Sequence, residues 1–296
     1  YNPPHKGYEI LAIKSTFERM KHLGIAEVIK FHLVFDDFLL KGSYYDVFEA
    51  IRAEILDDYK NLMARFYFDE DSDEAIKMAL IKLARSDRKK FSVNKILPQS
   101  MTNRVYAKLF SKDFLVLEKS QEKPRVKNKR QILKKSERAY KIEDKIHFNS
   151  HFSRFWFRFI EPNLSLLKEG RSEEILELIR REFDEYASLG FELLSGELMA
   201  KKLGFNGILL SSFWSKNIEL DMLFSINGKI IVGEAKYKER KICKNVLNLV
   251  LHKCERLGIK PDIIALFSKS GFSNELLGLK DERLRLYEIK DYEELL

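Results

Sequence analysis

The segment NIELDMLFSINGKIIVGEAK, residues 217–236, decides the fold of the C-terminal half of this chain. Its apolar runs predict two strands, over 218–225 and 229–235, that form a β hairpin. A crossover helix over 241–257 and another strand over 262–267 follow the hairpin. The other elements expected in this half are helices over 172–186, 190–203 and 274–277, and strands over 207–213 and 284–289. This order predicts an α/β sandwich with a mixed sheet.

Asp221, Glu234 and Lys236 lie on the two strands of the expected hairpin. Residues i and i+2 of a strand share a face, so Glu234 and Lys236 point the same way. Two carboxylates at one point hold a hard cation such as Mg²⁺, or Mn²⁺ in its place, and the bound metal activates a water molecule. A neighbouring lysine orients that water and stabilises the transition state. The pattern is that of metal-dependent phosphodiesterases.

The acid-x-Lys tripeptide is weak evidence alone, because it occurs repeatedly in this chain. It begins at Asp58, Asp87, Glu143, Glu234, Glu239 and Glu288. Only Glu234 has a hairpin partner strand that carries an acid. The alternative interpretation is a solvated strand edge with an ion pair.

A winged helix-turn-helix is predicted upstream of this domain. Helices are expected over 75–83, 92–97 and 100–112, followed by strands over 114–118 and 140–142 with a basic hairpin between them. In that arrangement the third helix enters the major groove and the wing lies on the DNA backbone. The polar residues expected to be exposed toward DNA on the third helix are Thr102, Asn103, Arg104 and Lys108. The alternative is a small helical connector.

The net charge of +8 is concentrated in one stretch. Residues 119–141 contain ten Lys and Arg against two Glu, so the remainder of the chain is neutral. Such a block is typical of contact with phosphate backbones. The candidate contacts are Lys123, Arg125, Lys127, Lys129 and Arg130. A solvated loop would show the same charge.

Composition and motifs exclude several classes of protein. The chain has 296 residues, 45% hydrophobic and 33% charged, which indicates a globular protein with room for more than one domain. No apolar run is long enough to span a membrane, and no phosphate-binding loop of nucleotide hydrolases is present. Cys243 and Cys254 fall on the crossover helix as core residues. Without a leader peptide, these features predict a cytoplasmic protein with no bound nucleotide and no membrane partner.

Two further stretches receive structural interpretations. The acidic residues 69–74 are interpreted as the start of a helix and not as a calcium loop. Residues 148–163 are rich in aromatic side chains and are interpreted as a buried seam between domains, although such residues can also stack on bases. His147 and His151 lack further ligands at metal-binding spacing.

Five motifs in order resemble the C-terminal domain of archaeal-type P-loop ATPases. They are FSRFWFRFIEPN (152–163), YASLGFELL (186–194), SFWSKNIELDML (212–223), IIVGEAKY (230–237) and ALFSKSGFS (265–273). That domain is similar to PD-(D/E)XK nucleases and typically follows a winged helix. The resemblance implies that Asp221, Glu234 and Lys236 match the catalytic core and Glu192 the acidic residue of the first helix. Trp214 matches the aromatic residue before the core strands, while Leu220 replaces the proline of the superfamily's name.

The sequence as a whole predicts three parts, and the resemblance covers about residues 70–280 of them. Residues 1–68 form a helical region, of which 36–68 resemble an ATPase lid although the ATPase core is absent; residues 69–147 form the winged helix; residues 148–296 form the PD-(D/E)XK nuclease-like domain. The leading hypothesis is a DNA-binding protein with a Mg²⁺-dependent endonuclease-like domain. Asp221, Glu234 and Glu192 would hold the metal, and Lys236 would position the attacking water.

Two rival hypotheses stay open. One is a non-catalytic DNA-binding or regulatory module on a nuclease-like scaffold, and the other is an accessory subunit of a separately encoded ATPase. RNA is an alternative to DNA as the partner, since nothing in the sequence distinguishes the two.

Overall fold

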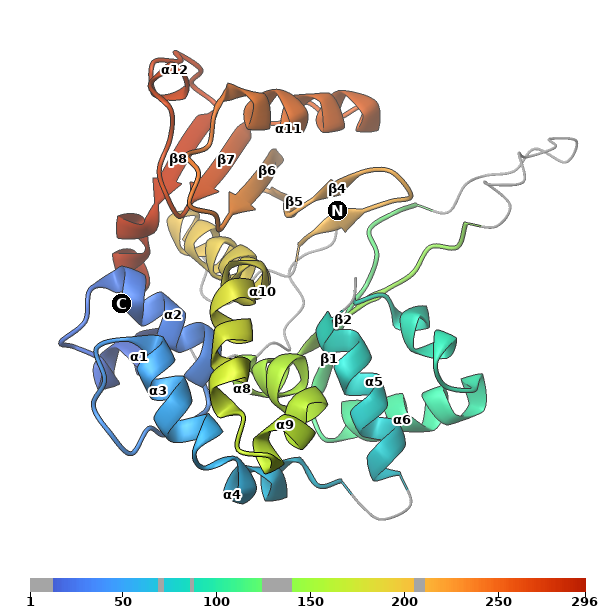
Figure 1. Cartoon of the computed structure of the whole chain (residues 1–296). Helices are drawn as coiled ribbons and strands as arrows, with labels where there is room; N and C mark the ends of the chain where they lie inside the picture. The colour runs from blue at the N-terminus through green and yellow to red at the C-terminus, as the bar shows by residue number, and fades with distance from the viewer. Residues whose placement is uncertain (1–12, 69–71, 86–87, 124–139, 205–210) are drawn as a thin grey trace, which may run out of the picture. The chain divides into compact units, whose positions relative to one another are not determined.

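The computed structural model describes residues 13–68, 72–85, 88–123, 140–204 and 211–296 (Figure 1). Contacts divide the chain into two compact units, each discontinuous in sequence. The first, called the sheet unit, consists of the described residues of Glu118–Lys145 and Glu192–Glu288. The second, called the helical unit, consists of the described residues of Gly7–Leu117, Ile146–Phe191 and Ile289–Leu296.

The sheet unit contains the expected mixed sheet, which confirms the α/β class. Its strands are β5 (Met222–Ile226), β6 (Lys229–Lys236), β7 (Ile263–Ser268) and β8 (Leu284–Glu288), in that order. β5 and β6 are antiparallel, whereas β7 runs parallel to both of its neighbours. Asn227 and Gly228, with φ of 51° and 77°, form the tight turn between β5 and β6.

Short elements complete the sheet unit. α11 (Lys244–Leu257) connects β6 to β7, and α12 (Asn274–Leu277) precedes β8 (Figure 1). β3 (Phe213–Trp214) pairs antiparallel with β4 (Glu219–Leu220). Leu247, Val250 and Cys254 of α11 are buried in one apolar core with the sheet, which confirms Cys254 as a core residue. The sequence also predicts Cys243 in this core, but it precedes the first turn of α11 and is half-buried.

The helical unit is built from helices in the chain segments before β1 (Leu115–Glu118) and after β2 (Lys145–Phe148). Its α-helices are α1 (Ile13–Arg19), α2 (Ile25–Phe35), α3 (Val47–Ala50), α4 (Tyr59–Met63), α5 (Asp73–Arg85), α6 (Gln99–Ser111), α8 (His151–Phe155), α9 (Leu164–Lys168) and the first part of α10 (Ser172–Lys202). Short 3-10 helices are η2 (Ala64–Phe66), η3 (Lys90–Lys95), η5 (Glu161–Asn163) and η6 (Ile289–Leu295), and π-helices are η1 (Ile51–Leu56) and η4 (Trp156–Ile160). Among the described residues, no helix has the length and apolar character needed to cross a membrane.

The aromatic stretch is buried, as the sequence predicts, and it packs within the helical unit. Phe66 stacks on Trp156 with ring centroids 4.8 Å apart. The ring of Phe157 meets the Phe66 ring edge-on. Residues 148–191 thus share a core with the N-terminal helices. The predicted boundaries at residues 68 and 147 stay predictions, because the compact units divide the chain differently.

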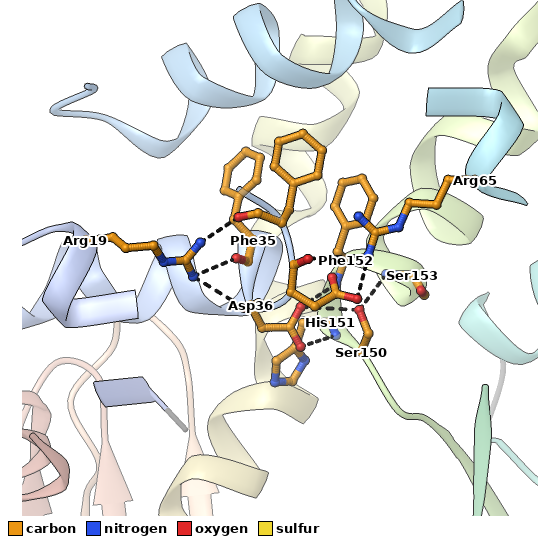
Figure 2. A network of polar contacts seen from close by, with 10 residues as sticks. Arg19, Phe35, Asp36, Arg65, Ser150, His151, Phe152 and Ser153 are labelled. Atoms are coloured by element: carbon orange, nitrogen blue, oxygen red, sulfur yellow. Dashed lines mark hydrogen bonds and ion pairs between the residues drawn. The ribbon is translucent and has the colours of Figure 1, made fainter. Parts of the chain in front are cut away.

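A buried carboxylate connects two segments of the helical unit. Asp36 accepts hydrogen bonds from the backbone N–H groups of His151 (2.7 Å) and Phe152 (3.0 Å) and from the Ser150 hydroxyl (3.3 Å), as Figure 2 shows. Arg19 donates to the carbonyl oxygens of Phe35 and Asp36 on the other side. Asp36 therefore fixes the start of α8 to the end of α2.

Three predicted elements, two helices and one strand, differ in the structure. The helices expected over 172–186 and 190–203 are one continuous helix, α10, which passes through Gly190 without a break. A Cβ atom at position 190 would lie 2.3 Å from Leu33 Cδ2, so this glycine serves close packing. The strand expected over 140–142 lies at Lys145–Phe148 instead, as β2, paired with β1 (Leu115–Glu118).

The three helices expected before β1 are present as α5, η3 and α6, and they pack on one another. The second of them is a 3-10 helix. Of the acidic cluster, residues 69–71 lie outside the described residues, and Asp73 and Glu74 form the first turn of α5. Residues 124–139 of the basic block and 207–210 of an expected strand also lie outside the described part of the chain.

Candidate active site

The structure brings Asp221, Glu234 and Lys236 together at one edge of the sheet unit. Asp221 lies in the bend between β4 and β5, and Glu234 and Lys236 lie on β6. The β5–β6 register pairs Met222 with Gly233, which places Asp221 beside Glu234. Asp221 Oδ2 accepts a hydrogen bond of 2.8 Å from the Ala235 N–H, so backbone pairing orients this carboxylate.

Lys236 and a second lysine neutralise Glu234. Lys236 Nζ donates to Glu234 Oε1 at 2.7 Å and lies 4.0 Å from Asp221 Oδ2. Lys253 Nζ, from α11, donates to Glu234 Oε2 at 2.9 Å. The Glu234 side chain is 9% exposed, and the Lys236 and Lys253 side chains are 32% and 26% exposed. Glu234 is therefore held between two ammonium groups that solvent can still reach.

Lys253 is a residue of this cluster that the sequence did not identify. It is the only lysine in the stretch between Val250 and Cys254, two residues that α11 buries against the sheet. Helical spacing alone does not show which end of the sheet such a side chain approaches. The parallel pairing of β6 with β7 sets that position, through the path of α11.

Negative charge is crowded at Asp221. Burial raises the pKa of Asp221 well above its ordinary value, and the carboxylates of Glu192 and Glu234 raise it further. Lys236 and the Ala235 N–H act in the opposite direction. Glu192 of α10 thus lies within electrostatic range of the cluster, as the family resemblance implies.

The pKa of Lys236 is also raised. Burial disfavours its charge, but the nearby carboxylates of Asp221 and Glu234 outweigh that effect. Lys236 is therefore an ammonium group across the physiological range. It can donate hydrogen bonds and stabilise developing negative charge, and it cannot accept a proton.

The donor set fits a divalent cation in its chemistry. Carboxylate oxygens are the ligands that Mg²⁺ and Mn²⁺ prefer, and a cation would relieve the repulsion that raises the pKa of Asp221. In the described residues, no group of three or more His, Cys, Asp and Glu side chains already encloses a common metal position. A cation bound by Glu234 would compete with Lys236 for Oε1.

The predicted nucleic-acid contacts divide into four groups. Asn103 and Arg104 are exposed on α6, and Lys123 is exposed beyond β1. Thr102 is 1% exposed and directs its hydroxyl toward the Leu97 carbonyl, so its predicted exposure to DNA is wrong. Lys108 is half-buried and donates to Ser72 Oγ at 3.0 Å. The predicted contacts Arg125, Lys127, Lys129 and Arg130 lie outside the described residues.

Trp214 has a packing role in the sheet unit. It is 4% exposed, and its indole N–H donates to the Glu143 carbonyl at 2.8 Å. The Lys145 ammonium lies 4.6 Å from the centre of its ring and pairs with Glu219. Trp214 therefore holds the start of β2 beside the β3–β4 hairpin.

Comparison with known proteins finds similarity over part of this chain. A stretch of 103 residues, 32% of the chain, is 28% identical to an uncharacterized protein of Methanocaldococcus jannaschii and covers 23% of that protein. The match thus spans less than a quarter of the relative's length. No solved structure matches the chain.

A family model matches the central part of the candidate site. Residues 156–246 match DUF234, described as "Archaea bacterial proteins of unknown function". The matched segment contains Glu192, Asp221, Glu234 and Lys236 and ends before Lys253. Over residues 156–246 this chain is therefore similar to that family of archaeal and bacterial proteins.

Proposed function

We propose that this protein binds DNA and that its sheet unit hydrolyses phosphodiester bonds with the aid of Mg²⁺ or Mn²⁺. The observation that carries the proposal is the meeting of Asp221, Glu234 and Lys236 at one sheet edge. The chain's resemblance to PD-(D/E)XK nuclease domains supports the same reaction. The exposed Asn103 and Arg104 and the basic segment over 119–141 support binding to DNA.

Each residue has a separate role in this proposal. Asp221 and Glu234 would hold the metal, with Glu192 as a third or outer ligand. A bound divalent cation lowers the pKa of water and offsets charge on the phosphate. Lys236, which stays protonated, would orient the attacking water and stabilise the negative charge that develops on the phosphate oxygens.

Lys253 would act as a positioning residue. Its hydrogen bond to Glu234 Oε2 fixes the carboxylate while Oε1 faces Lys236. When a cation takes the place of Lys236 at Oε1, Lys253 would keep Glu234 from rotating away. This role does not require contact between Lys253 and the substrate.

The first test is cleavage of single- and double-stranded DNA with Mg²⁺ or Mn²⁺. We expect Asp221→Ala and Lys236→Gln each to lower the cleavage rate by at least about 100-fold, because each removes an electrostatic contribution made in the transition state. Glu275→Gln is the matched control, since Glu275 is an exposed acid of the same unit outside the cluster. Cleavage that persists in Asp221→Ala would remove these residues from the mechanism.

A non-catalytic scaffold is the second candidate, because ion pairs to Lys236 and Lys253 already compensate Glu234. Metal binding separates the two candidates. A site that binds Mn²⁺ raises the unfolding temperature by mass action, and Asp221→Ala removes that rise. A scaffold shows no metal-dependent stabilisation and no cleavage, while DNA binding continues.

Binding to DNA is tested through its dependence on salt. Replacing Lys127, Lys129 and Arg130 with Gln should flatten the slope of log K against log salt by about 0.9 for each phosphate that the protein no longer neutralises. The control replaces three exposed lysines elsewhere, Lys21, Lys60 and Lys168. An unchanged slope in the first variant would mean that the basic segment does not touch DNA, and competition with RNA of the same sequence would show which nucleic acid is preferred.

A further inference from the structure

Four arginines line one small hollow of the helical unit, which we call the arginine pocket. Arg85 is the last residue of α5, and Arg88 lies three positions later in the chain. Arg154 lies on α8 and Arg158 on η4. Tyr186 and Glu185 of α10 complete the polar lining of a cavity of about 130 Å³. Figure 1 labels three of the helices that contribute to the pocket: α5, α8 and α10. The proposed hydrolysis does not use this pocket.

Three of these arginines donate hydrogen bonds to uncharged groups. Arg154 is 8% exposed, donates to the Tyr186 carbonyl at 2.8 Å and lies 4.0 Å from the centre of the Tyr186 ring. Arg85 donates to the Arg158 carbonyl at 3.2 Å. Arg88 donates to Nδ1 of the buried His147 at 3.2 Å.

Arg158 differs from Arg85 and Arg88 because it has carboxylate partners. Its guanidinium donates to Glu182 and to Glu185, at 3.0 Å in each case. Among the described residues, neither Arg85 nor Arg88 forms an ion pair. These two arginines therefore bring to the pocket two guanidinium groups without an ion pair to a described residue, and the Glu182 carboxylate lies within electrostatic range of Arg85.

The surroundings of Arg85 disfavour its positive charge. Burial lowers the pKa of Arg85, the charge of Arg158 lowers it further, and the Glu182 carboxylate acts in the opposite direction. Guanidinium groups that repel one another at a half-buried site gain most from an oxyanion, which accepts their paired N–H groups in a fixed geometry. The backbone of Arg88 adds a further sign of constraint, since its φ of 62° is uncommon for a residue with a side chain.

The size of the pocket limits what can enter it. Pockets that enclose a drug-sized ligand measure roughly 300–1,000 Å³. A cavity of about 130 Å³ admits a tetrahedral oxyanion and excludes a base and sugar. Two negative charges, as on a phosphate monoester, would balance the charges of Arg85 and Arg88.

We propose that the arginine pocket binds the phosphate group of a phosphorylated ligand. Arg85, Arg88 and Arg154 would donate to the phosphate oxygens, and Arg158 would stay fixed by its glutamates as part of the wall. The phosphate belongs to a free compound such as a nucleoside monophosphate or to the phosphorylated end of a nucleic acid. This inference is independent of phosphodiester hydrolysis, because none of its residues belongs to the sheet unit.

The experiment measures binding of three probes to the full chain by calorimetry or fluorescence anisotropy. The probes are inorganic phosphate, a nucleoside 5′-monophosphate, and a short single-stranded DNA with either a 5′-phosphate or a 5′-hydroxyl. The test variant is Arg85→Gln/Arg88→Gln, which changes one exposed and one half-buried residue. The control variant is Arg180→Gln/Arg181→Gln, which removes the same charge from α10 outside the pocket.

We expect the test variant to weaken binding of a phosphate probe at least tenfold, since removal of each charge-assisted hydrogen bond costs about that factor. The control should change it less than twofold. Binding of the monophosphate assigns a free compound as the source, and preference for the 5′-phosphorylated DNA assigns a nucleic acid end. Arg85→Lys/Arg88→Lys should recover only part of the affinity, because lysine keeps the charge and loses the paired donors.

Two results would overturn the proposal. One is the absence of binding of all three probes to the unmodified chain. The other is equal binding by the test and control variants, which would show that the interaction is a general effect of charge. Circular dichroism and the unfolding temperature check that both variants fold, so a loss of binding is not a loss of structure.

Discussion

Asp36 in the helical unit and Asp221 in the sheet unit are both inward-facing carboxylates with raised pKa values, yet their surroundings differ. Asp36 lies against backbone N–H groups and a hydroxyl, all at the start of α8. Asp221 has one backbone N–H and lies among two other carboxylates and a lysine. Burial of a carboxylate therefore does not by itself indicate chemistry. The partners decide whether it stabilises the fold or serves a site.

The largest effect should come from Asp36→Ala. This change leaves the N–H groups of His151 and Phe152 and the Ser150 hydroxyl without an acceptor in a buried place. We expect a loss of about 3 kcal/mol or more in the free energy of unfolding, measured with urea. The neighbouring Asp37, which is exposed and paired with Arg65, is the control. A loss no larger than that in Asp37→Ala would contradict the structural role of Asp36.

A smaller effect concerns pH. Burial, with the charge of Asp37, raises the pKa of Asp36 to about 7, whereas the unfolded chain keeps the ordinary value near 3.8. Between these pH values the folded protein binds the extra proton, so this residue makes the free energy of unfolding fall as pH rises from 4 to 7. Above pH 7 its contribution is constant.

Asp36→Asn tests this sign. The variant should lose the part of the pH dependence that lies between 4 and 7, in urea titrations at several pH values. It should also be less stable, because an amide cannot accept both backbone hydrogen bonds. Equal pH slopes in the variant and the unmodified chain would show that Asp36 is ionised throughout this range.

The smallest effect, of opposite sign, should come from Asp221→Asn. An amide still accepts the Ala235 N–H, and it removes one of three like charges from the cluster. We expect a gain of about 1 kcal/mol in the free energy of unfolding, together with loss of cleavage. Glu275→Gln is again the control. A loss of stability in Asp221→Asn would mean that the site is an ordinary ion-pair network.

The sheet unit can be predicted from the sequence because its signals are local. Apolar runs define β5 to β8 within a few residues, helical spacing predicts the stripe of α11, and Asn274–Leu277 has the predicted bounds. Asp221, Glu234 and Lys236 can be placed together because hairpin pairing is short-range. Lys253 cannot, since its position depends on the parallel pairing of β7.

The helical unit is harder to predict because its determinants are distant in sequence. The sequence predicts a break in the helix before Gly190, but this glycine packs closely against Leu33, more than 150 residues earlier. The charge of Lys145 argues against a strand, yet Glu219 and the Trp214 ring accommodate that charge. Thr102 has the polarity of a surface residue on a recognition helix and is covered by neighbours that no local pattern indicates.

The position of η6 has a consequence for the order in which the chain acquires its structure. Tyr292 is fully buried, its ring lies 5.1 Å from that of Phe191, and η6 also packs on α2. The helical unit therefore needs residues that are translated before Glu192–Glu288 and residues that are translated after them. While a ribosome is still making the sheet unit, the N-terminal helices lack this cover and expose apolar surface. The sheet-unit residues Glu192–Glu288 are all made before η6, so they can fold while the helical unit still waits for its last segment.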